Sequence, residues 1–350
     1  MNLINSFVDS LLKEIQSYSK QFQSETVDTI YFGGGTPSAL KTEKLSSILS
    51  QIFNNFNISE TAEITIECNP EDIIEDKSKF KGIAKSGVNR ISLGIQSFVD
   101  SELEYLTRHH NSSDAYESIL FLNDVFDNLS IDLIYALHNQ SIANVEYNLE
   151  KISQHRIKHV SAYTLILEKG TLMYKQMKQA DLIKQADQKA EQYYFIISEM
   201  LANMGYKQYE VSNYSLPGYE SRHNQKYWNF ENYLGLGPSA HSFIDKRRFS
   251  NVSNLKIYNN LIESNKLPVD ENILLDKTQL QNDYFISVLR SRGVELSKYR
   301  RIFDEEFLLK YDKETKELLS LGLANLSETH FYLTQKGFAL ADEITLKFVN

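Results

Sequence analysis

The sequence predicts an α/β protein in which short apolar strands alternate with amphipathic helices. Apolar or β-branched runs recur at roughly 30-residue spacing, and helical patterns fill most of the gaps between them. Strands separated in this way form βα units with a parallel sheet, and their crossovers are nearly always right-handed. Successive units therefore curl in one sense, towards a closed or partial barrel or an open wound sheet. Periodicity alone does not choose between these.

The predicted elements follow one another in a regular order. Apolar residues spaced about three to four positions apart predict a first helix over 3–18. A β-rich run at 29–32 stops at three consecutive glycines, 33–35, and a second helical pattern covers 45–56. A long helix is predicted at 187–203. The later strands are predicted at 63–67, 90–95, 130–137, 159–167 and 206–211.

The last part of the chain has a different pattern. Residues 270–350 are mostly helical, with a short β-rich run at 331–333 beside a turn at Gly337, which indicates a small helical domain of winged-helix type. Its slight acidic excess favours a packing or substrate-covering role over DNA binding. We therefore expect a main α/β part over 1–240, a connector over 241–269 and a C-terminal helical domain over 270–350.

The composition is that of an ordinary globular protein. Of the 350 residues, 42% are hydrophobic and 24% are charged, and the net charge of −9 argues against a general polyanion binder. No apolar run approaches the roughly 18 residues of a membrane span. The N-terminus lacks the charged start and apolar block of a signal peptide, and the single cysteine, Cys68, cannot form an intramolecular disulfide. These features predict a cytoplasmic protein with no membrane span and no nucleic-acid partner.

Unusual residues gather at the carboxyl ends of the predicted strands, where parallel α/β folds bind their ligands. The sharpest pattern is Gly33-Gly34-Gly35-Thr36-Pro37, whose glycines let backbone groups approach a ligand closely. It lacks the third glycine of a dinucleotide fingerprint and the Gly-Lys-Ser/Thr of a P-loop. A tight turn without a ligand remains the alternative. A second glycine-rich segment, 233–241, also predicts a close backbone approach.

Four polar residues on successive units suit a ligand with ribose, amino and carboxylate groups. Glu67 and Asp132 can accept hydrogen bonds from hydroxyls or an ammonium, Gln96 ends the next predicted strand, and Arg108 can clamp a carboxylate. Each one alone is more simply explained as a surface ion pair or a helix cap. Their common position at the strand ends is what suggests a shared pocket. Cys68 has no cysteine partner and is most simply a small buried residue.

The eight histidines do not predict a metal site. His109 and His110 are adjacent and diverge on any regular element, and His155 and His159 fall on different elements. The segment His223 to Trp228 instead combines a potential axial ligand with flat apolar rings, an environment that suits a porphyrin. A packed loop with a hydrogen-bonded histidine is the alternative.

Five segments together resemble one protein family. They are TIYFGGGTPS (29–38), ITIECNP (64–70), NRISLGIQSF (89–98), IDLIY (131–135) and HNxxYW (223–228). In this order they resemble the radical S-adenosylmethionine (SAM) proteins of the oxygen-independent coproporphyrinogen III oxidase family. The third and fifth segments are most similar to its haem-chaperone (HemW-like) branch. The resemblance covers nearly the whole chain.

The resemblance implies a fold and a set of site residues. The fold is a partial (β/α)6 TIM-like radical SAM barrel, N-terminally truncated in this chain, with the C-terminal helical domain. The implied SAM-binding residues are Gly34, Gly35 and Thr36 against the amino-acid moiety, and Glu67, Gln96, Arg108, Asp132 and Ile166 along the rest of the cavity. His223 belongs to the haem-chaperone motif, and its role as a haem ligand is our hypothesis.

Two departures from the family pattern stand out. The Cys-x-x-x-Cys-x-x-Cys loop that holds the family's [4Fe–4S] cluster is absent, and Cys68 cannot replace it because three thiolates are needed. The family's Gly-Leu-Pro-Gly-Gln turn is Ala-Leu-His-Asn-Gln at 136–140. Either the sequence starts too late to include the cluster loop, or the chain is a decayed or repurposed paralogue.

Three functions remain open from the sequence. The leading one is a haem-chaperone-like protein that binds haem and, in its complete form, SAM and a [4Fe–4S] cluster. The second is an oxygen-independent coproporphyrinogen III oxidase of porphyrin biosynthesis. The third is a cluster-free, degenerate porphyrin- or partner-binding paralogue. The expected partners are haem or porphyrin and a haem-acceptor protein.

Overall fold

The structure is a computed structural model that describes residues 3–165 and 183–349. The chain divides into two compact units. Unit 1 comprises Met1–Ile30, Glu43–Ala62 and Ser221–Asn350, and unit 2 comprises Tyr31–Thr42 and Glu63–Glu220. The division of the chain at 240 and 270 that the sequence suggests stays a prediction.

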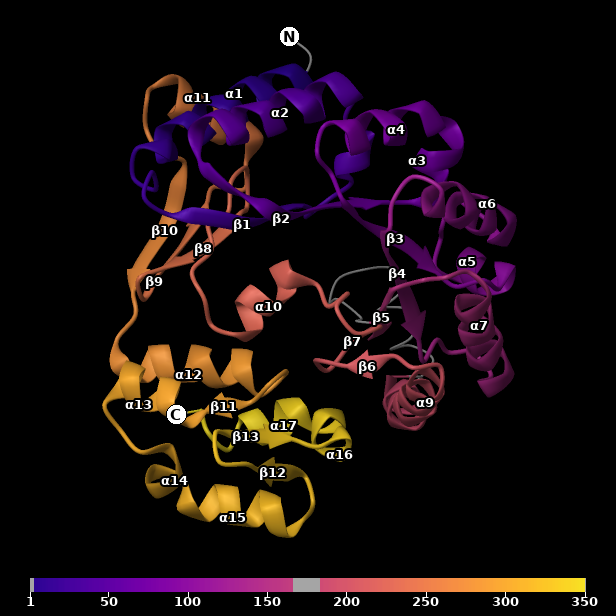
Figure 1. Ribbon diagram of the computed structural model, residues 1–350, viewed down its shortest axis with the longest axis vertical. Coiled ribbons are helices and arrows are strands. Elements are labelled where there is room, and N and C mark those ends of the chain that lie inside the picture. The colour runs from indigo at the N-terminus through magenta and orange to yellow at the C-terminus, as the bar shows by residue number, and fades with distance from the viewer. Residues whose placement is uncertain (1–2, 166–182, 350) are drawn as a thin grey trace. The chain divides into compact units, whose positions relative to one another are not determined.

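A seven-stranded sheet confirms the α/β prediction. Its order is β1-β2-β3-β4-β5-β7-β6, and its parallel strands curl as in a partial barrel (Figure 1). The strands are β1 (Thr26–Phe32), β2 (Asn57–Cys68), β3 (Arg90–Gln96), β4 (Asn128–Tyr135), β5 (His159–Thr164), β6 (Lys207–Gln208) and β7 (Asn213–Ser215). The pairs from β2 to β5 are parallel, whereas β7 pairs antiparallel with both β5 and β6. The single strand predicted at 206–211 is therefore wrong, because the chain turns back between two short strands.

Alternation along the strands separates an apolar face from a polar one. On β3, Ile91, Leu93 and Ile95 are fully buried, while Ser92 and Gly94 between them line a pocket. The apolar face packs on helices. In unit 2 these are α3 (Pro70–Glu75), α4 (Lys77–Lys85), α5 (Asp100–Tyr105), α6 (Ser112–Asn123), α7 (Ile142–Gln154) and α9 (Ile183–Asn203), preceded by the 3₁₀ turn η1 (Pro37–Ala39). None of the helices in the described ranges is long and apolar enough to cross a membrane.

Unit 1 is held together by a buried carboxylate on its first helix. The unit contains α1 (Leu3–Ser19), most of α2 (Thr42–Asn55), α10 (Arg222–Trp228), α11 (Leu255–Glu263) and an antiparallel sheet of β8 (His241–Ile244), β9 (Arg247–Asn251) and β10 (Val269–Leu274). Glu14 of α1 is fully buried and accepts hydrogen bonds from Gly237 N at 2.8 Å, Asn251 Nδ2 at 2.7 Å and the Tyr258 hydroxyl at 2.6 Å. Burial raises the pKa of Glu14 in spite of these bonds.

The C-terminal part of unit 1 is largely helical, as predicted. Its helices are α12 (Lys277–Val288), α13 (Leu296–Phe303), α14 (Phe307–Lys310), α15 (Asp312–Ser320), α16 (Gln335–Ala339) and α17 (Ala341–Thr345). They accompany an antiparallel sheet of β11 (Val294–Glu295), β13 (His330–Leu333) and β12 (Ala324–Leu326). Phe285 lies in an aromatic core, with ring centroids 5.2–6.0 Å from those of Tyr284, Tyr299, Phe307, Tyr311 and Phe348.

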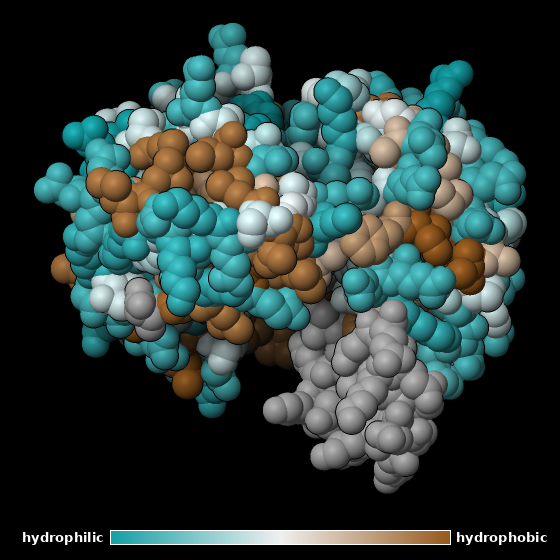
Figure 2. Space-filling view, turned by 90° about the horizontal axis from the view of Figure 1, so that it is seen from below, coloured by the Kyte–Doolittle hydropathy of each residue, from teal (hydrophilic) through white to brown (hydrophobic). Residues whose placement is uncertain are grey.

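On the face shown in Figure 2, hydrophilic residues predominate and apolar side chains gather in patches between them. Among the exposed apolar residues of the C-terminal part are Leu309 and Leu346, which are 79% and 72% exposed.

Candidate functional site

A pocket of about 220 Å³ lies in unit 2 where β1 to β4 end, and we call it the strand-end pocket. Its lining is mainly polar and comes from the strand ends and the loops that follow them. The lining residues are Gly35, Thr36, Glu67, Cys68, Asn69, Ser92, Gly94, Gln96 and Asp132. The prediction that the strand ends share a pocket is therefore confirmed.

The glycines after β1 are required by the backbone and by Glu67. A Cβ atom on Gly33 would lie 2.6 Å from the Tyr31 ring and 2.8 Å from Glu67 Oε1. Gly34 has a φ of +78°, which side-chain-bearing residues rarely adopt, and its N–H donates a hydrogen bond to the Glu67 carboxylate. Gly35 and Thr36 then line the pocket. The three glycines thus form a turn, the glycine cradle, whose backbone packs against the Glu67 carboxylate and hydrogen-bonds to it.

Two carboxyl groups face the pocket from neighbouring parts of the sheet. Glu67 Oε1 accepts a hydrogen bond from the Tyr31 hydroxyl at 2.8 Å, and burial raises the pKa of both groups. Asp132 is half-buried and accepts hydrogen bonds from Ser92 and Ser161. Burial, together with the charge of Glu67, raises the pKa of Asp132 to about 6 despite those bonds. Both groups are acceptors suited to ribose hydroxyls or an ammonium.

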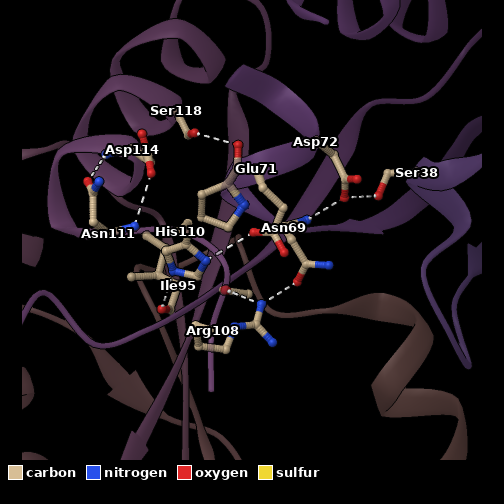
Figure 3. Close-up of polar contacts among 12 residues, drawn as sticks. Ser38, Asn69, Glu71, Asp72, Ile95, Arg108, His110, Asn111, Asp114 and Ser118 are labelled. Atoms are coloured by element: carbon tan, nitrogen blue, oxygen red, sulfur yellow. Dashed lines mark hydrogen bonds and ion pairs between the residues drawn. The ribbon is translucent and has the colours of Figure 1, made fainter. Parts of the chain in front are cut away.

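Arg108 lies behind the pocket lining and not within it. Its Nη2 donates to Asn69 Oδ1 at 2.6 Å and to Gly94 O at 3.2 Å (Figure 3). Its buried Nε has no hydrogen-bond partner among the described residues. Gln96, which ends β3 with a φ of +69°, lines the pocket beside Gly94. Arg108 therefore positions two lining residues and retains hydrogen-bonding capacity.

A second polar layer supports the loops around the pocket (Figure 3). Asp72 Oδ2 accepts from the Ser38 hydroxyl at 2.6 Å and from Asn69 N at 3.2 Å, which joins the loops after β1 and β2. His110 lies within 3.0 Å of both Glu71 Oε2 and Ile95 O through its two ring nitrogens. These contacts fix the backbone of the strand ends.

The turn at 136–140, where the sequence departs from the family pattern, is an ordered hydrogen-bonded loop. Ala136 has a φ of +61°, and its N–H donates to Gln140 Oε1 at 2.8 Å. Gln140 Nε2 in turn donates to Glu102 Oε2 at 3.0 Å, which also accepts from the Ser97 hydroxyl at 2.6 Å. The loop after β4 is thereby tied to the loop after β3 without the family's glycines.

The pocket contains most, but not all, of the residues singled out from the sequence. Gly35, Thr36, Glu67, Gln96 and Asp132 line it, Gly34 and Arg108 contact lining residues, and Ile166 lies outside the described residues. Sequence reasoning did not assign four of the lining residues to the site, which are Cys68, Asn69, Ser92 and Gly94. Ser92 could have been found by alternation, since it is the register partner of Glu67 on β3.

His223 is in unit 1, on α10, and both of its ring nitrogens are hydrogen-bonded. Nδ1 lies 3.0 Å from Thr29 Oγ1 and Nε2 lies 2.9 Å from the Tyr227 hydroxyl. The His223 and Tyr227 rings meet edge to face with centroids 5.2 Å apart. To bind iron, this imidazole would have to give up one of these contacts.

The residues of this chain fit SAM but not an iron–sulfur cluster. The glycine cradle and the carboxyls of the strand-end pocket suit an amino group and ribose hydroxyls. A cluster needs three thiolates, whereas the chain has one cysteine, whose thiol is buried with a pKa that burial raises well above its usual value. Within the described residues, no group of three or more His, Cys, Asp and Glu side chains is arranged to hold a metal.

Comparisons with known proteins find a family match in the first half of the chain and relatives that cover nearly all of it. A family model described as the Radical SAM superfamily matches residues 7–152. The heme chaperone HemW of Lactococcus lactis is 34% identical over 347 residues, covering 99% of this chain and 90% of the relative. The HemW of Bacillus subtilis is 31% identical over 345 residues, covering 97% and 90%. Coproporphyrinogen III oxidase (HemN) from Escherichia coli, a radical SAM enzyme, has a TM-score of 0.77 at 20% identity, covering 99% of this chain and 84% of that chain, which supports the fold.

Proposed function

Since the chain belongs to the HemW family of radical SAM proteins, we propose that it binds haem as cargo and holds SAM in the strand-end pocket. The observation that carries the SAM part is the pairing of the glycine cradle with two carboxyls whose pKa burial raises. Cofactor pockets combine a shaped cavity with a few oriented polar groups, as this one does.

Each polar group of the pocket has a proposed partner on SAM. The backbone at Gly34, Gly35 and Thr36 would contact the amino-acid moiety. Glu67 and Asp132 would accept hydrogen bonds from the ammonium or the ribose hydroxyls, and Gln96 would serve a remaining polar group. Arg108 would contribute by holding Asn69 and Gly94 of the lining in place. Bound SAM would supply a nucleoside sulfonium at the strand ends.

We propose no step through an iron–sulfur cluster, because this chain's residues do not provide the thiolates. The likeness to coproporphyrinogen III oxidase concerns the fold, and we propose no oxidase activity from it. Haem binding is proposed from the relatives that are named heme chaperones. A protein that accepts the haem is the proposed partner.

Isothermal titration with SAM tests the pocket. We expect wild type to bind, and Glu67→Gln and Asp132→Asn each to weaken binding by about tenfold through loss of a charged acceptor. Glu104→Gln, exposed on α5, is the matched control and should bind as wild type does. No heat of binding with folded wild type, or equal affinity in all four proteins, would contradict this assignment.

Titration with hemin tests the cargo. We expect a saturable shift of the Soret band at a stoichiometry of about one haem per chain. A linear, unsaturable change would instead indicate nonspecific adsorption and would contradict the proposed function.

A further inference from the structure

A second pocket, of about 290 Å³, lies in unit 1 on the sheet of β8, β9 and β10, and we call it the sheet pocket. Two cross-strand rows form its floor. His241 pairs with Ser250, which pairs with Glu271, and in the next row on this face Arg248 pairs with Ile273. Tyr233 also lines the pocket. The pocket thus combines an imidazole, a guanidinium and apolar surface.

The backbone at His241 is fixed by the glycine-rich segment that precedes it. A Cβ atom on Gly235 would lie 2.2 Å from His241 O, so only glycine permits this approach. Gly235 N donates to the Ser242 hydroxyl at 2.9 Å, and Tyr233 and Phe243 exchange backbone hydrogen bonds of 2.8 and 3.0 Å. The close backbone approach predicted for 233–241 is therefore confirmed. It places the start of β8 rigidly, as an oriented ligand requires.

The imidazole of His241 is available, in contrast to that of His223. His241 is exposed, and no described residue hydrogen-bonds its ring. His223 is already hydrogen-bonded through both nitrogens to Thr29 and Tyr227. A neutral imidazole nitrogen with a free lone pair is what an iron ligand must offer.

We propose that His241 is the axial ligand of haem iron and that the sheet pocket holds the porphyrin. This inference rests on the proposed haem binding and assigns to His241 the role that the sequence pattern suggests for His223. Tyr233 and Ile273, which is 45% exposed, supply apolar contacts for the macrocycle.

The charges around the pocket set the orientation of the cargo. Arg248, whose side chain is half exposed, forms an ion pair with Asp283 of α12 and remains within reach of a propionate. Glu271 is exposed at the opposite end of the His241 row, where its charge disfavours a propionate. The propionates therefore lie towards Arg248. A pocket of about 290 Å³ is smaller than the roughly 300–1,000 Å³ of most ligand pockets, so it would enclose only part of the haem and leave the rest accessible for transfer.

Hemin titrations of four proteins test the proposal: wild type, His241→Ala, His223→Ala and His109→Ala. We expect His241→Ala to shift the Soret maximum and weaken binding by about tenfold or more. His109 is an exposed histidine of unit 2, and its substitution should leave both quantities unchanged. His223→Ala should retain the wild-type Soret maximum.

Imidazole rescue separates ligand loss from misfolding. Added imidazole should give His241→Gly the spectrum that wild type shows at the same imidazole concentration, because it can occupy the vacated coordination position. A wild-type spectrum and affinity in His241→Ala, or loss of the spectrum only in His223→Ala, would overturn the proposal while leaving haem binding intact. No saturable binding by wild type would instead overturn the proposed function itself.

Discussion

Gly33 lies directly against Glu67, so that a single methyl group on Gly33 would come within 2.8 Å of the Glu67 carboxylate oxygen. The Tyr31 ring would be 2.6 Å away. This contact explains why position 33 is a glycine and why the Glu67 carboxylate lies beside the glycine turn.

The first prediction follows from this contact. Gly33→Ala should lower the free energy of unfolding by roughly 1–3 kcal/mol through overpacking, and should weaken SAM binding because Glu67 is displaced. Denaturant unfolding and calorimetry measure the two effects. Gly35→Ala is the matched control for stability, since its Cβ would have no neighbour within 4 Å. If the two variants are equally stable, the Glu67 side chain can move away from an alanine at position 33 at no measurable cost in unfolding free energy.

The second prediction concerns the raised pKa of Asp132. A carboxyl whose pKa rises to about 6 on folding binds its proton more tightly in the folded state, so the wild type loses stability as the pH rises through about 4 to 6. Asp132→Asn abolishes this loss. The gain in unfolding free energy of the variant over wild type should be larger at pH 8 than at pH 5 by about 1 kcal/mol. The same gain at both pH values would rule out a raised pKa of Asp132 in the folded protein.

The third prediction concerns the turn that leads into Arg108. Thr107 has a φ of +55°, and the bonds Arg108 N to Leu103 O and Thr107 N to Glu104 O form a Schellman motif at the end of α5. A β-branched residue is strained there, so Thr107→Gly should stabilise the protein by about 1 kcal/mol in thermal or denaturant unfolding. Thr107→Ala keeps the left-handed strain and should gain less. In the exposed helical position Ala202, substitution by Gly should instead cost about 1 kcal/mol.

The fourth prediction concerns Glu14, which joins α1 to the segment before His241. Glu14→Ala leaves the buried donors of Gly237, Asn251 and Tyr258 without their acceptor. We expect a loss of about 3 kcal/mol or more of unfolding free energy. Asp9→Ala, exposed on the same helix, should change stability by less than about 0.5 kcal/mol. A similar small effect for Glu14→Ala would mean that water replaces the carboxylate at no cost.

The strands of the sheet were predictable where they are long and regularly apolar. The runs at 90–95 and 130–137 correspond to β3 and β4 within two residues at each end. The error at 206–211 arose because two short strands, β6 and β7, are defined by pairing with β5 and with each other, which a local pattern does not encode.

The strand-end pocket was predictable in its outline because parallel strands bring their carboxyl ends together. The pKa values of its carboxyl groups were not predictable. The pKa of Asp132 depends on burial and on Glu67, a residue of another strand. Nor were the contacts of Arg108 with Asn69 and Gly94, behind the lining, predictable from the sequence.

The amino-acid order by itself determined the βα alternation, the glycine turns and the presence of acceptors at the strand ends, because these depend on backbone preferences and on residues close in the chain. Only the tertiary structure decided which side chains are free to act. His223 and Thr29 are 194 residues apart in sequence, and their hydrogen bond engages one imidazole, whereas the ring of His241 stays accessible. Whether the nitrogens of an imidazole already have hydrogen-bond partners depends on three-dimensional packing, because those partners can be distant along the chain.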